Sequence, residues 1–293
     1  MFVFYTIMKI LCINHNNHNN VSFGQSRVHA IDLAYKKVVQ QGLKDTFQLN
    51  CKLEDLNPIM GPFELKEIIS KLRPAQYIAN DDFRANFHLH TVASDGRLTA
   101  SEFLEQCKAW ADEIFAKMKS KDDLPPFSAA ITDHNAIKST LETIALISQN
   151  PDKYKNFKFA VGCEFFFDGY KKPNSKFEAV GLGFNPFAPE LMPMFKGSDA
   201  FTNDIADAKK VLSAGGVLSF SHPISTPDKI NDDFFSFLKS QGINGVEGNY
   251  QYFYVDKENV AKGNKLLEPL IRKYNMFLTG GTDSHRKSIF SRH

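Results

Sequence analysis

From about residue 85 onwards, two patterns of apolar residues alternate along the chain. Short apolar runs that are typical of strands cover 85–91, 127–133, 157–167, 177–184, 216–222, 243–250 and 276–283. Apolar residues at helical spacing lie between most of these runs, at 100–118, 136–147, 203–214, 228–240 and 256–274. Because strands and helices alternate, the pattern predicts a parallel sheet with helices outside it, either a β/α barrel or a doubly wound sheet.

Local signals support several of these helices. The apolar residues of 100–118 that we expect on one buried face are Phe103, Leu104, Cys107, Trp110, Ile114, Phe115 and Met118. Thr99 and Glu102 supply a capping box in front of this helix. Gly215 and Gly216 are a good stop for the helix at 203–214, and Pro269 predicts a bend in the helix at 256–274.

The first 80 residues differ from the rest because they show no candidate chemistry. Residues 26–42 and 63–73 have helical periodicity, whereas the polar segment 14–20, which contains His15 and His18, is typical of a loop. No helix is predicted after 276–283 to cover the apolar flank of that strand. We therefore expect residues 1–80 to form a partly helical N-terminal extension that packs on a barrel made by residues 81–293.

Composition and charge exclude several classes of protein. The 293 residues are 43% hydrophobic and 23% charged, which excludes a largely disordered chain. A net charge of +2 gives no electrostatic case for a dedicated nucleic-acid-binding protein. Neither a zinc finger nor a disulfide scaffold is predicted, because no CxxC pair occurs among Cys12, Cys51, Cys107 and Cys163. The apolar opening 1–13 is too short to span a bilayer and is a poor signal peptide, so we expect a cytoplasmic protein.

Candidate chemistry is concentrated at the ends of the predicted strands. His88 and His90 are two residues apart in a strand and therefore point the same way, as two imidazoles on one metal ion must. Asp95 lies on the following loop, and His134 follows the next strand. Glu164 lies inside an apolar run, where a carboxylate is costly to bury unless it is paired or bound to a metal.

Two later strands carry residues of the same kinds. His222 ends the run at 216–222, and Asp283 and His285 follow the last strand, again two residues apart. Each of these clusters alone has an ordinary structural explanation. Since the active site of a β/α barrel lies at the carboxyl ends of its strands, we expect all of them to converge there. Five imidazoles and three carboxylates exceed the needs of one tetrahedral ion and favour two or three divalent ions bridged by carboxylate and hydroxide.

The motifs HLHTVASDG, TDHN, GCEF, SHP and GTDSH, in this order, resemble the metal-binding motifs of the PHP (polymerase and histidinol phosphatase) superfamily over about residues 83–290. The resemblance implies a distorted (β/α)7 TIM-like barrel and up to three ions, commonly zinc, manganese or iron. It also implies cleavage of phosphate esters. The SDG form of the first motif is similar to that of small stand-alone phosphoesterases that act on nucleotides or short RNA ends.

The resemblance also implies how the ions are held. The first ion would bind His88, His90, Glu164 and Asp283, and Glu164 would bridge to a second ion that also binds His222. A third ion would bind Asp95, His134 and His285.

Glu178 departs from the family pattern, because relatives usually have a histidine at this point of the next strand. A carboxylate here would favour manganese, iron or magnesium over zinc. The alternative is an exposed glutamate at a strand start, with one ion bound weakly or absent.

We hypothesise that a metal-bridging hydroxide attacks the phosphorus of a small phosphorylated substrate or a short nucleic-acid end. His222 or His285 would protonate the leaving group, although both are also candidate ligands, and Asp283 is the third residue expected to act in catalysis. The candidates for binding the substrate phosphate are Arg286, Arg97 and a lysine of the loop before 177–184, with Lys172 preferred there. No membrane partner is expected.

Two other functions stay open. An amidohydrolase-type metal-dependent hydrolase would also open with HxH on its first strand and place an aspartate late. Such enzymes often need a bridging lysine at the end of a mid-barrel strand, where this chain has Glu164. The second alternative is a catalytically inactive metal-binding domain, which degraded ligands would indicate; Glu178 is the one departure here.

Overall fold

A computed structural model of the chain describes residues 58–73, 77, 83–118, 123–171, 175–197, 200–248 and 257–290. The chain divides into two compact units, Met1–Asp55 and Leu56–His293, and the described residues all belong to the second. The predicted helix at 26–42 and the predicted loop at 14–20 lie outside the described residues. Residues from 56 to 80, which we expected to belong to the N-terminal extension, are part of the same unit as the strands.

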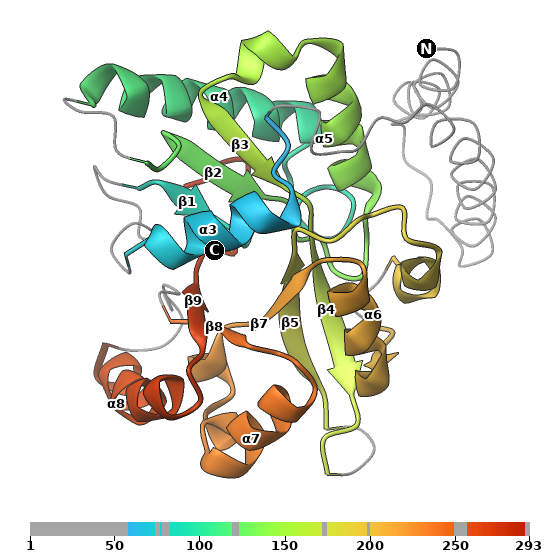
Figure 1. Ribbon diagram of the computed structural model, residues 1–293, viewed down its shortest axis with the longest axis vertical. Helices are drawn as coiled ribbons and strands as arrows, with labels where there is room; N and C mark the ends of the chain where they lie inside the picture. Colours follow the sequence, from blue (N-terminus) through green and yellow to red (C-terminus); the bar gives the residue numbers. More distant parts are fainter. Residues whose placement is uncertain are drawn as a thin grey trace. The chain divides into compact units, whose positions relative to one another are not determined.

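The described strands form two sheets (Figure 1). One is parallel, with the order β1-β2-β3, and the other is mixed, with the order β6-β4-β5-β7-β8-β9. The strands are β1 (Ala85–Asn86), β2 (Phe127–Ala130), β3 (Phe157–Ala160), β4 (Gly162–Asp168), β5 (Phe177–Leu182), β6 (Asn203–Asp204), β7 (Val217–Phe220), β8 (Gly245–Glu247) and β9 (Phe277–Thr279).

The described strands form two separate sheets, so the structure does not show the distorted (β/α)7 TIM-like barrel that the resemblance implies. The fold is a mixed α/β arrangement in which the two sheets are linked by single bridges, Leu89 to Ser284 and His134 to Glu164. Leu89, His134 and Ser284 follow the ends of β1, β2 and β9, whereas Glu164 lies near the start of β4. The sheets are thus held together at the same end that carries the candidate chemistry.

One predicted strand, 157–167, is two strands in the structure. Its first half, β3, pairs with β2, and its second half, β4, pairs with β5 in the other sheet. The break falls at Val161 and Gly162, where a Cβ atom on Gly162 would lie 2.5 Å from the carbonyl oxygen of Ile131. The apolar run is continuous because both halves are buried, so hydrophobicity alone does not show the break.

The orientation of β5 also differs from the prediction of a parallel sheet. β5 runs antiparallel to both of its neighbours, β4 and β7. Between Asp168 and Phe177 there are 177 − 168 − 1 = 8 residues. A parallel connection needs about a dozen residues or more, so this link permits only a hairpin.

The helices lie mainly where periodicity predicts them. They are α3 (Pro62–Lys71), α4 (Ala100–Lys117), α5 (Lys138–Gln149), α6 (Ala208–Ser213), α7 (Asp232–Ser240) and α8 (Lys257–Lys273). Short 3-10 turns are η4 (Pro151–Tyr154), η5 (Pro189–Met194), η6 (Ile205–Asp207), η7 (Pro223–Ser225) and η8 (Pro227–Lys229). The predicted helix at 203–214 is instead β6, η6 and α6 in succession.

Helix α4 confirms the predicted capping box. Thr99 Oγ1 accepts the backbone N–H of Glu102 at 3.2 Å, and the Glu102 carboxylate accepts the backbone N–H of Thr99 at 2.9 Å. Phe103 and Leu104 are fully buried against β2 and β3, as expected for the inner face. Phe115 was wrongly assigned to this face, since it is 45% exposed near the end of the helix.

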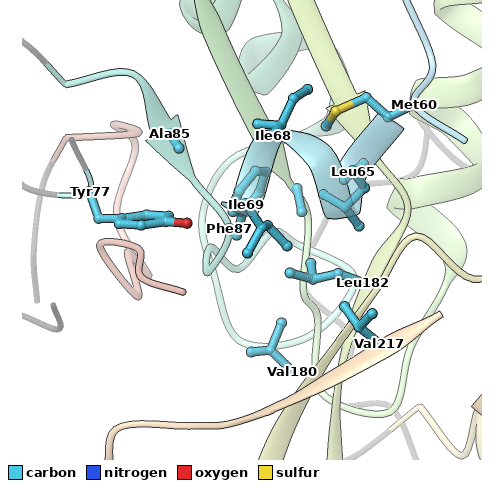
Figure 2. Packing of buried hydrophobic residues seen from close by; sticks show 12 residues of the cluster. Met60, Leu65, Ile68, Ile69, Tyr77, Ala85, Phe87, Val180, Leu182 and Val217 are labelled. Atoms are coloured by element: carbon cyan, nitrogen blue, oxygen red, sulfur yellow. The ribbon is translucent and has the colours of Figure 1, made fainter. Parts of the chain in front are cut away.

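Helix α3 packs across one end of the strands (Figure 2). Leu65, Ile68 and Ile69 of α3 are buried in an apolar cluster with residues from both sheets, including Phe87 and Leu182. The helix also contacts β9, and the Tyr77 hydroxyl donates to the carbonyl of Leu278 in that strand at 3.2 Å. Apolar residues before position 80 therefore cover strand surface of the second unit.

Alternation along β4 decides which side chains face the candidate site. Phe165 and Phe167 point to one side, where Phe165 contacts Phe184 and Phe167 contacts Phe177. Glu164 and Phe166 point to the other side, because successive side chains of a strand alternate. Glu164 is thereby directed to the interior between the sheets. Among the described residues, no helix is both long and apolar enough to cross a membrane.

Candidate metal centre

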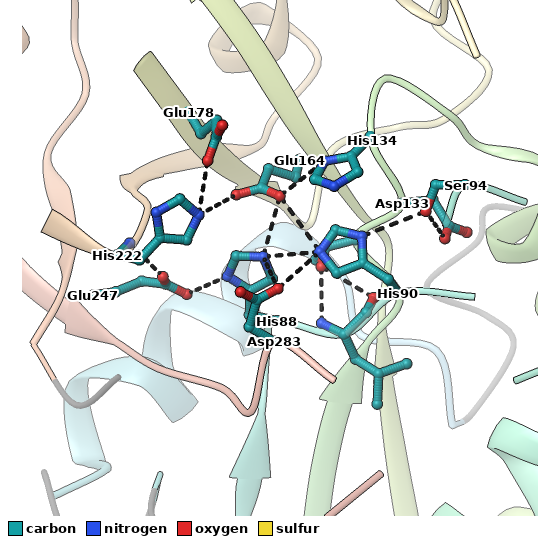
Figure 3. Close-up of polar contacts among 12 residues, drawn as sticks. His88, His90, Ser94, Asp133, His134, Glu164, Glu178, His222, Glu247 and Asp283 are labelled. Atoms are coloured by element: carbon teal, nitrogen blue, oxygen red, sulfur yellow. Dashed lines mark hydrogen bonds and ion pairs between the residues drawn. The ribbon is translucent and has the colours of Figure 1, made fainter. Parts of the chain in front are cut away.

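His88 and His90 form the centre of a cluster of imidazoles and carboxylates (Figure 3). Both residues have no exposed surface, and their Nε2 atoms lie 3.1 Å apart. Glu164 Oε2 lies 3.2 Å from His88 Nε2 and 3.4 Å from His90 Nε2. Asp283 Oδ1 lies 3.3 Å and 3.1 Å from the same two atoms. Four side chains from three distant chain segments thus direct their donor atoms at one another.

A second group lies on the Asp95 side of His90. Asp95 Oδ2 is 3.1 Å from His285 Nε2, and Asp95 Oδ1 is 3.6 Å from His134 Nε2 and 3.8 Å from His90 Nδ1. His134 also reaches Glu164 through Nδ1, at 3.1 Å. His90 and Glu164 therefore link this group to the centre of the cluster.

A third group contains Glu178, whose position in the family pattern is unusual. His222 Nε2 lies 2.8 Å from Glu178 Oε2 and 3.3 Å from Glu164 Oε1. The Glu178 side chain is only 27% exposed and points into the cluster. The structure therefore does not support the alternative of a glutamate directed into solvent.

The predicted ligands are thus all brought together. The structure gathers His88, His90, Asp95, His134, Glu164, Glu178, His222, Asp283 and His285. Within this set, which we call the ligand cluster, four overlapping groups have donor atoms within 4.8 Å of one another: His90, Asp95, His134 and His285; His88, His90 and Glu164; His88, His222 and Asp283; and Glu164, Glu178 and His222.

The surroundings of the Glu164 carboxylate show whether the ligand cluster fits metal ions. Both of its carboxylate oxygens are buried, and neither accepts a well-directed hydrogen bond from the described residues. Imidazole nitrogens nevertheless lie 3.1 to 3.4 Å away on several sides. A buried carboxylate is costly unless it is paired or coordinates a metal. Nitrogen and carboxylate donors that converge on shared points fit divalent transition metals.

Charge pairing shifts the pKa values of these groups. Burial lowers the pKa of His88, but the charges of Glu164, Glu247 and Asp283 outweigh it and hold that pKa well above its ordinary value. Burial likewise lowers the pKa of His134, whereas Asp95 and Glu164 raise it to about 10. Burial raises the pKa of Glu164, but the surrounding imidazoles hold it well below its usual range. Without ions, protonated imidazoles balance the carboxylates.

The backbone around the ligand cluster is locally strained. Asn135, His222 and Asp283 have positive φ angles of 44°, 27° and 48°. Such angles are uncommon outside glycine and occur where the surrounding structure imposes them, often at functional sites. Gly281 is needed for close approach, because a Cβ atom there would lie 2.4 Å from the backbone nitrogen of His88.

Asp133 holds the loop that carries Asp95. Its carboxylate accepts the backbone N–H of Thr91 at 2.7 Å, the Thr91 hydroxyl at 2.6 Å and the Ser94 hydroxyl at 2.7 Å. Gly96 completes this turn, since a Cβ atom there would lie 2.4 Å from the carbonyl of His90. The SDG sequence therefore has a structural role beside its aspartate.

Sequence reasoning missed Glu247. This residue ends β8, is 1% exposed, and lies 2.8 Å from His88 Nδ1. The signal was present, because Glu247 stands in the apolar run 243–250 just as Glu164 stands in 157–167. At either position a buried carboxylate is costly unless it is paired or bound to a metal.

The predicted phosphate-binding residues are placed less clearly. Arg97 and Arg286 are both exposed, next to the turns that carry Asp95 and His285, and neither takes part in the contacts that hold the ligand cluster together. Lys172 lies outside the described residues. Its neighbour Lys171 pairs with Asp233 at 2.9 Å, with both side chains largely exposed.

No protein-family model and no curated protein matches the chain. Among solved structures, the chain is similar to that of a presumed metal-dependent phosphoesterase from Bifidobacterium adolescentis, with 14% identity and a TM-score of 0.49 over 71% of this chain and 89% of the other. It is also similar to an amidohydrolase from Chromobacterium violaceum with bound sulfate and no metal, with 16% identity and a TM-score of 0.48 over 72% and 90%.

Proposed function

We propose that the chain is a metal-dependent phosphoesterase of the PHP superfamily. The observation that carries the proposal is the convergence of the ligand cluster around Glu164, whose buried oxygens lack well-directed hydrogen bonds from the described residues. Motifs spread over about 200 residues of sequence supply these side chains in the order that the superfamily resemblance implies. A purely structural role does not account for so many buried charges in one place.

Two or three divalent ions would be held by the overlapping groups of the ligand cluster. The first set is His88, His90, Glu164 and Asp283; the second is Glu164, Glu178 and His222; and the third is Asp95, His134 and His285. Since Glu178 adds a carboxylate where relatives have an imidazole, manganese or iron is favoured over zinc at the second position.

When bound, divalent ions neutralise the charge of a phosphate ester and lower the pKa of bound water. The chain itself would supply proton transfer and attraction of the substrate. His222 and His285 are each 15% exposed, so whichever of the two imidazoles is not bound to an ion would be able to protonate a leaving group at the surface of the cluster. Arg97 and Arg286 would attract a small phosphorylated substrate or a short nucleic-acid end. The cytoplasmic location stays a prediction.

The proposal is tested by assaying the purified protein, loaded separately with manganese, iron and zinc, against phosphomonoesters, phosphodiesters and amides. We expect metal-dependent hydrolysis of at least one phosphate ester. Hydrolysis of amides alone would favour the amidohydrolase alternative. Bound metal without turnover on any substrate would favour an inactive metal-binding domain.

A pair of double variants locates the activity in the ligand cluster. His88→Ala with His90→Ala should abolish metal-dependent turnover and lower the number of bound ions. His15→Ala with His18→Ala removes the same number of imidazoles from a segment without predicted chemistry. This variant should leave the turnover and the number of bound ions unchanged. Equal turnover in the two double variants would show that the site lies elsewhere.

A further inference from the structure

We propose that Glu247 is a positioning residue that decides which ring nitrogen of His88 faces the ions and that ties this choice to the backbone of His222. The inference rests on the metal centre of the proposed function. It concerns neither the identity of the substrate nor a direct ligand.

The two oxygens of Glu247 contact two different members of the ligand cluster (Figure 3). Oε1 lies 2.8 Å from His88 Nδ1, and Oε2 accepts the backbone N–H of His222 at 2.8 Å. Glu247 is 1% exposed, so water does not compete for these contacts. One carboxylate at the end of β8 thus joins residues that follow β1 and β7.

The carboxylate dictates the proton arrangement of the His88 ring. An ionised carboxylate can only accept hydrogen bonds, so His88 Nδ1 must carry the proton. In the metal-loaded protein, Nε2 would then be the nitrogen that offers its lone pair to an ion, beside Glu164 and Asp283, which lie 3.2 and 3.3 Å from it. Metal-bound histidines commonly have their second nitrogen fixed in this way.

Because the second oxygen of Glu247 accepts a backbone N–H, the substitution Glu247→Gln should reverse the protonation of the His88 ring. The backbone N–H of His222 is always a donor, and it lies in a residue with φ 27° and ψ 59°. In Glu247→Gln, the amide oxygen must face this N–H to avoid opposing two donors. The amide NH2 then faces His88 Nδ1, which has to become an acceptor. The proton moves to Nε2, and the lone pair is withdrawn from the ions.

Both oxygens of Glu247 are engaged with protein donors, unlike those of Glu164. This contrast separates a residue that orients ligands from one that binds ions. The structure therefore assigns Glu247 to positioning, although both residues are buried glutamates in short apolar strands.

The experiment compares wild type, Glu247→Gln and Asp112→Asn after loading with zinc, with bound ions counted by elemental analysis and affinity measured by chelator competition. We expect Glu247→Gln to bind zinc about 10- to 100-fold more weakly at one position. Asp112→Asn is the control, because it makes the same change from carboxylate to amide at a residue that contacts Lys108 and Asn156 rather than any part of the ligand cluster. It should keep the wild-type ion count.

Nuclear magnetic resonance of the zinc-loaded wild type tests the same point without any variant. The ¹⁵N shifts should show His88 protonated at Nδ1 and metal-bound at Nε2. Coordination through Nδ1, or unchanged zinc affinity in a folded Glu247→Gln protein, would overturn the inference. If wild type binds no zinc, manganese or iron, the proposed function fails instead, and the two failures are therefore distinguishable.

Discussion

Phe87 and His88 are neighbours in the chain, yet they belong to two regions of opposite character. Phe87 lies in the apolar cluster with Leu65 of α3 and Leu182 of β5. His88 lies in the ligand cluster, within 3.3 Å of Glu164 and Asp283. Segments of both sheets thus contribute apolar side chains to the cluster around α3 and polar side chains to the ligand cluster (Figures 2 and 3).

The difference between the two regions lies in how their members depend on one another. Each side chain of the apolar cluster is stabilised by removal from water, which is non-directional and roughly proportional to buried area. The fully buried members of the ligand cluster, such as His88 and Glu164, are tolerated because opposite charges lie beside them. Loss of one apolar residue should therefore cost stability alone, whereas loss of one ligand should disturb all its partners.

Metal removal should produce the largest effect. Treatment with a chelator should reduce hydrolysis to the uncatalysed rate, and added manganese or iron should restore it. Circular dichroism should stay close to that of the loaded protein, because the apolar cluster contains none of the ligands. Global unfolding on chelation would show instead that the two regions are not energetically separate.

Substitution in the apolar cluster should lower the stability of the protein and leave its metal binding unchanged. Leu65 is 1% exposed, and Leu65→Ala should lower the free energy of unfolding by about 2–5 kcal/mol. Denaturant titration measures this loss. At temperatures where the variant is folded, its metal content should equal that of wild type; loss of ions there would show that α3 supports the ligand cluster directly.

Ion binding should release protons. The pKa of His134 is raised to about 10 in the metal-free chain, so this imidazole is protonated at pH 7 and must lose its proton to bind a metal. Metal affinity should therefore rise with pH towards 10. The contribution of His134 to metal-free stability should be complete below about pH 6.5 and be lost as pH rises through about 10. Calorimetry at pH 7 in two buffers of different ionisation enthalpy measures the protons released.

The smallest effect should come from an apolar residue that lies in neither region. Phe115 is 45% exposed on α4, so Phe115→Ala should change the free energy of unfolding by about 0.5 kcal/mol or less. Thermal unfolding compared with Leu65→Ala gives the contrast. A loss as large as that of Leu65→Ala would mean that Phe115 is covered in solution.

The residues that gather at the strand ends were predicted well, because the type and spacing of a few residues are enough to identify them. The spacing of His88 and His90 forces them to the same side of a strand, and a carboxylate such as Glu164 within an apolar run needs a partner. The capping box of α4 was equally readable, because both of its partners lie within one turn. Glu247 was missed although the same burial argument applied to it.

The amino-acid sequence by itself determined which imidazoles and carboxylates lie together, where most strands and helices lie, and most of the buried faces of the helices. These properties depend on the types of residue and their spacing within short segments of the chain. Tertiary structure alone decided that 157–167 divides between two sheets, that β5 runs antiparallel, and that Glu247 joins His88 to His222. The physical reason is that register, sheet membership and side-chain partners are set by groups far apart in the chain, which local periodicity does not record.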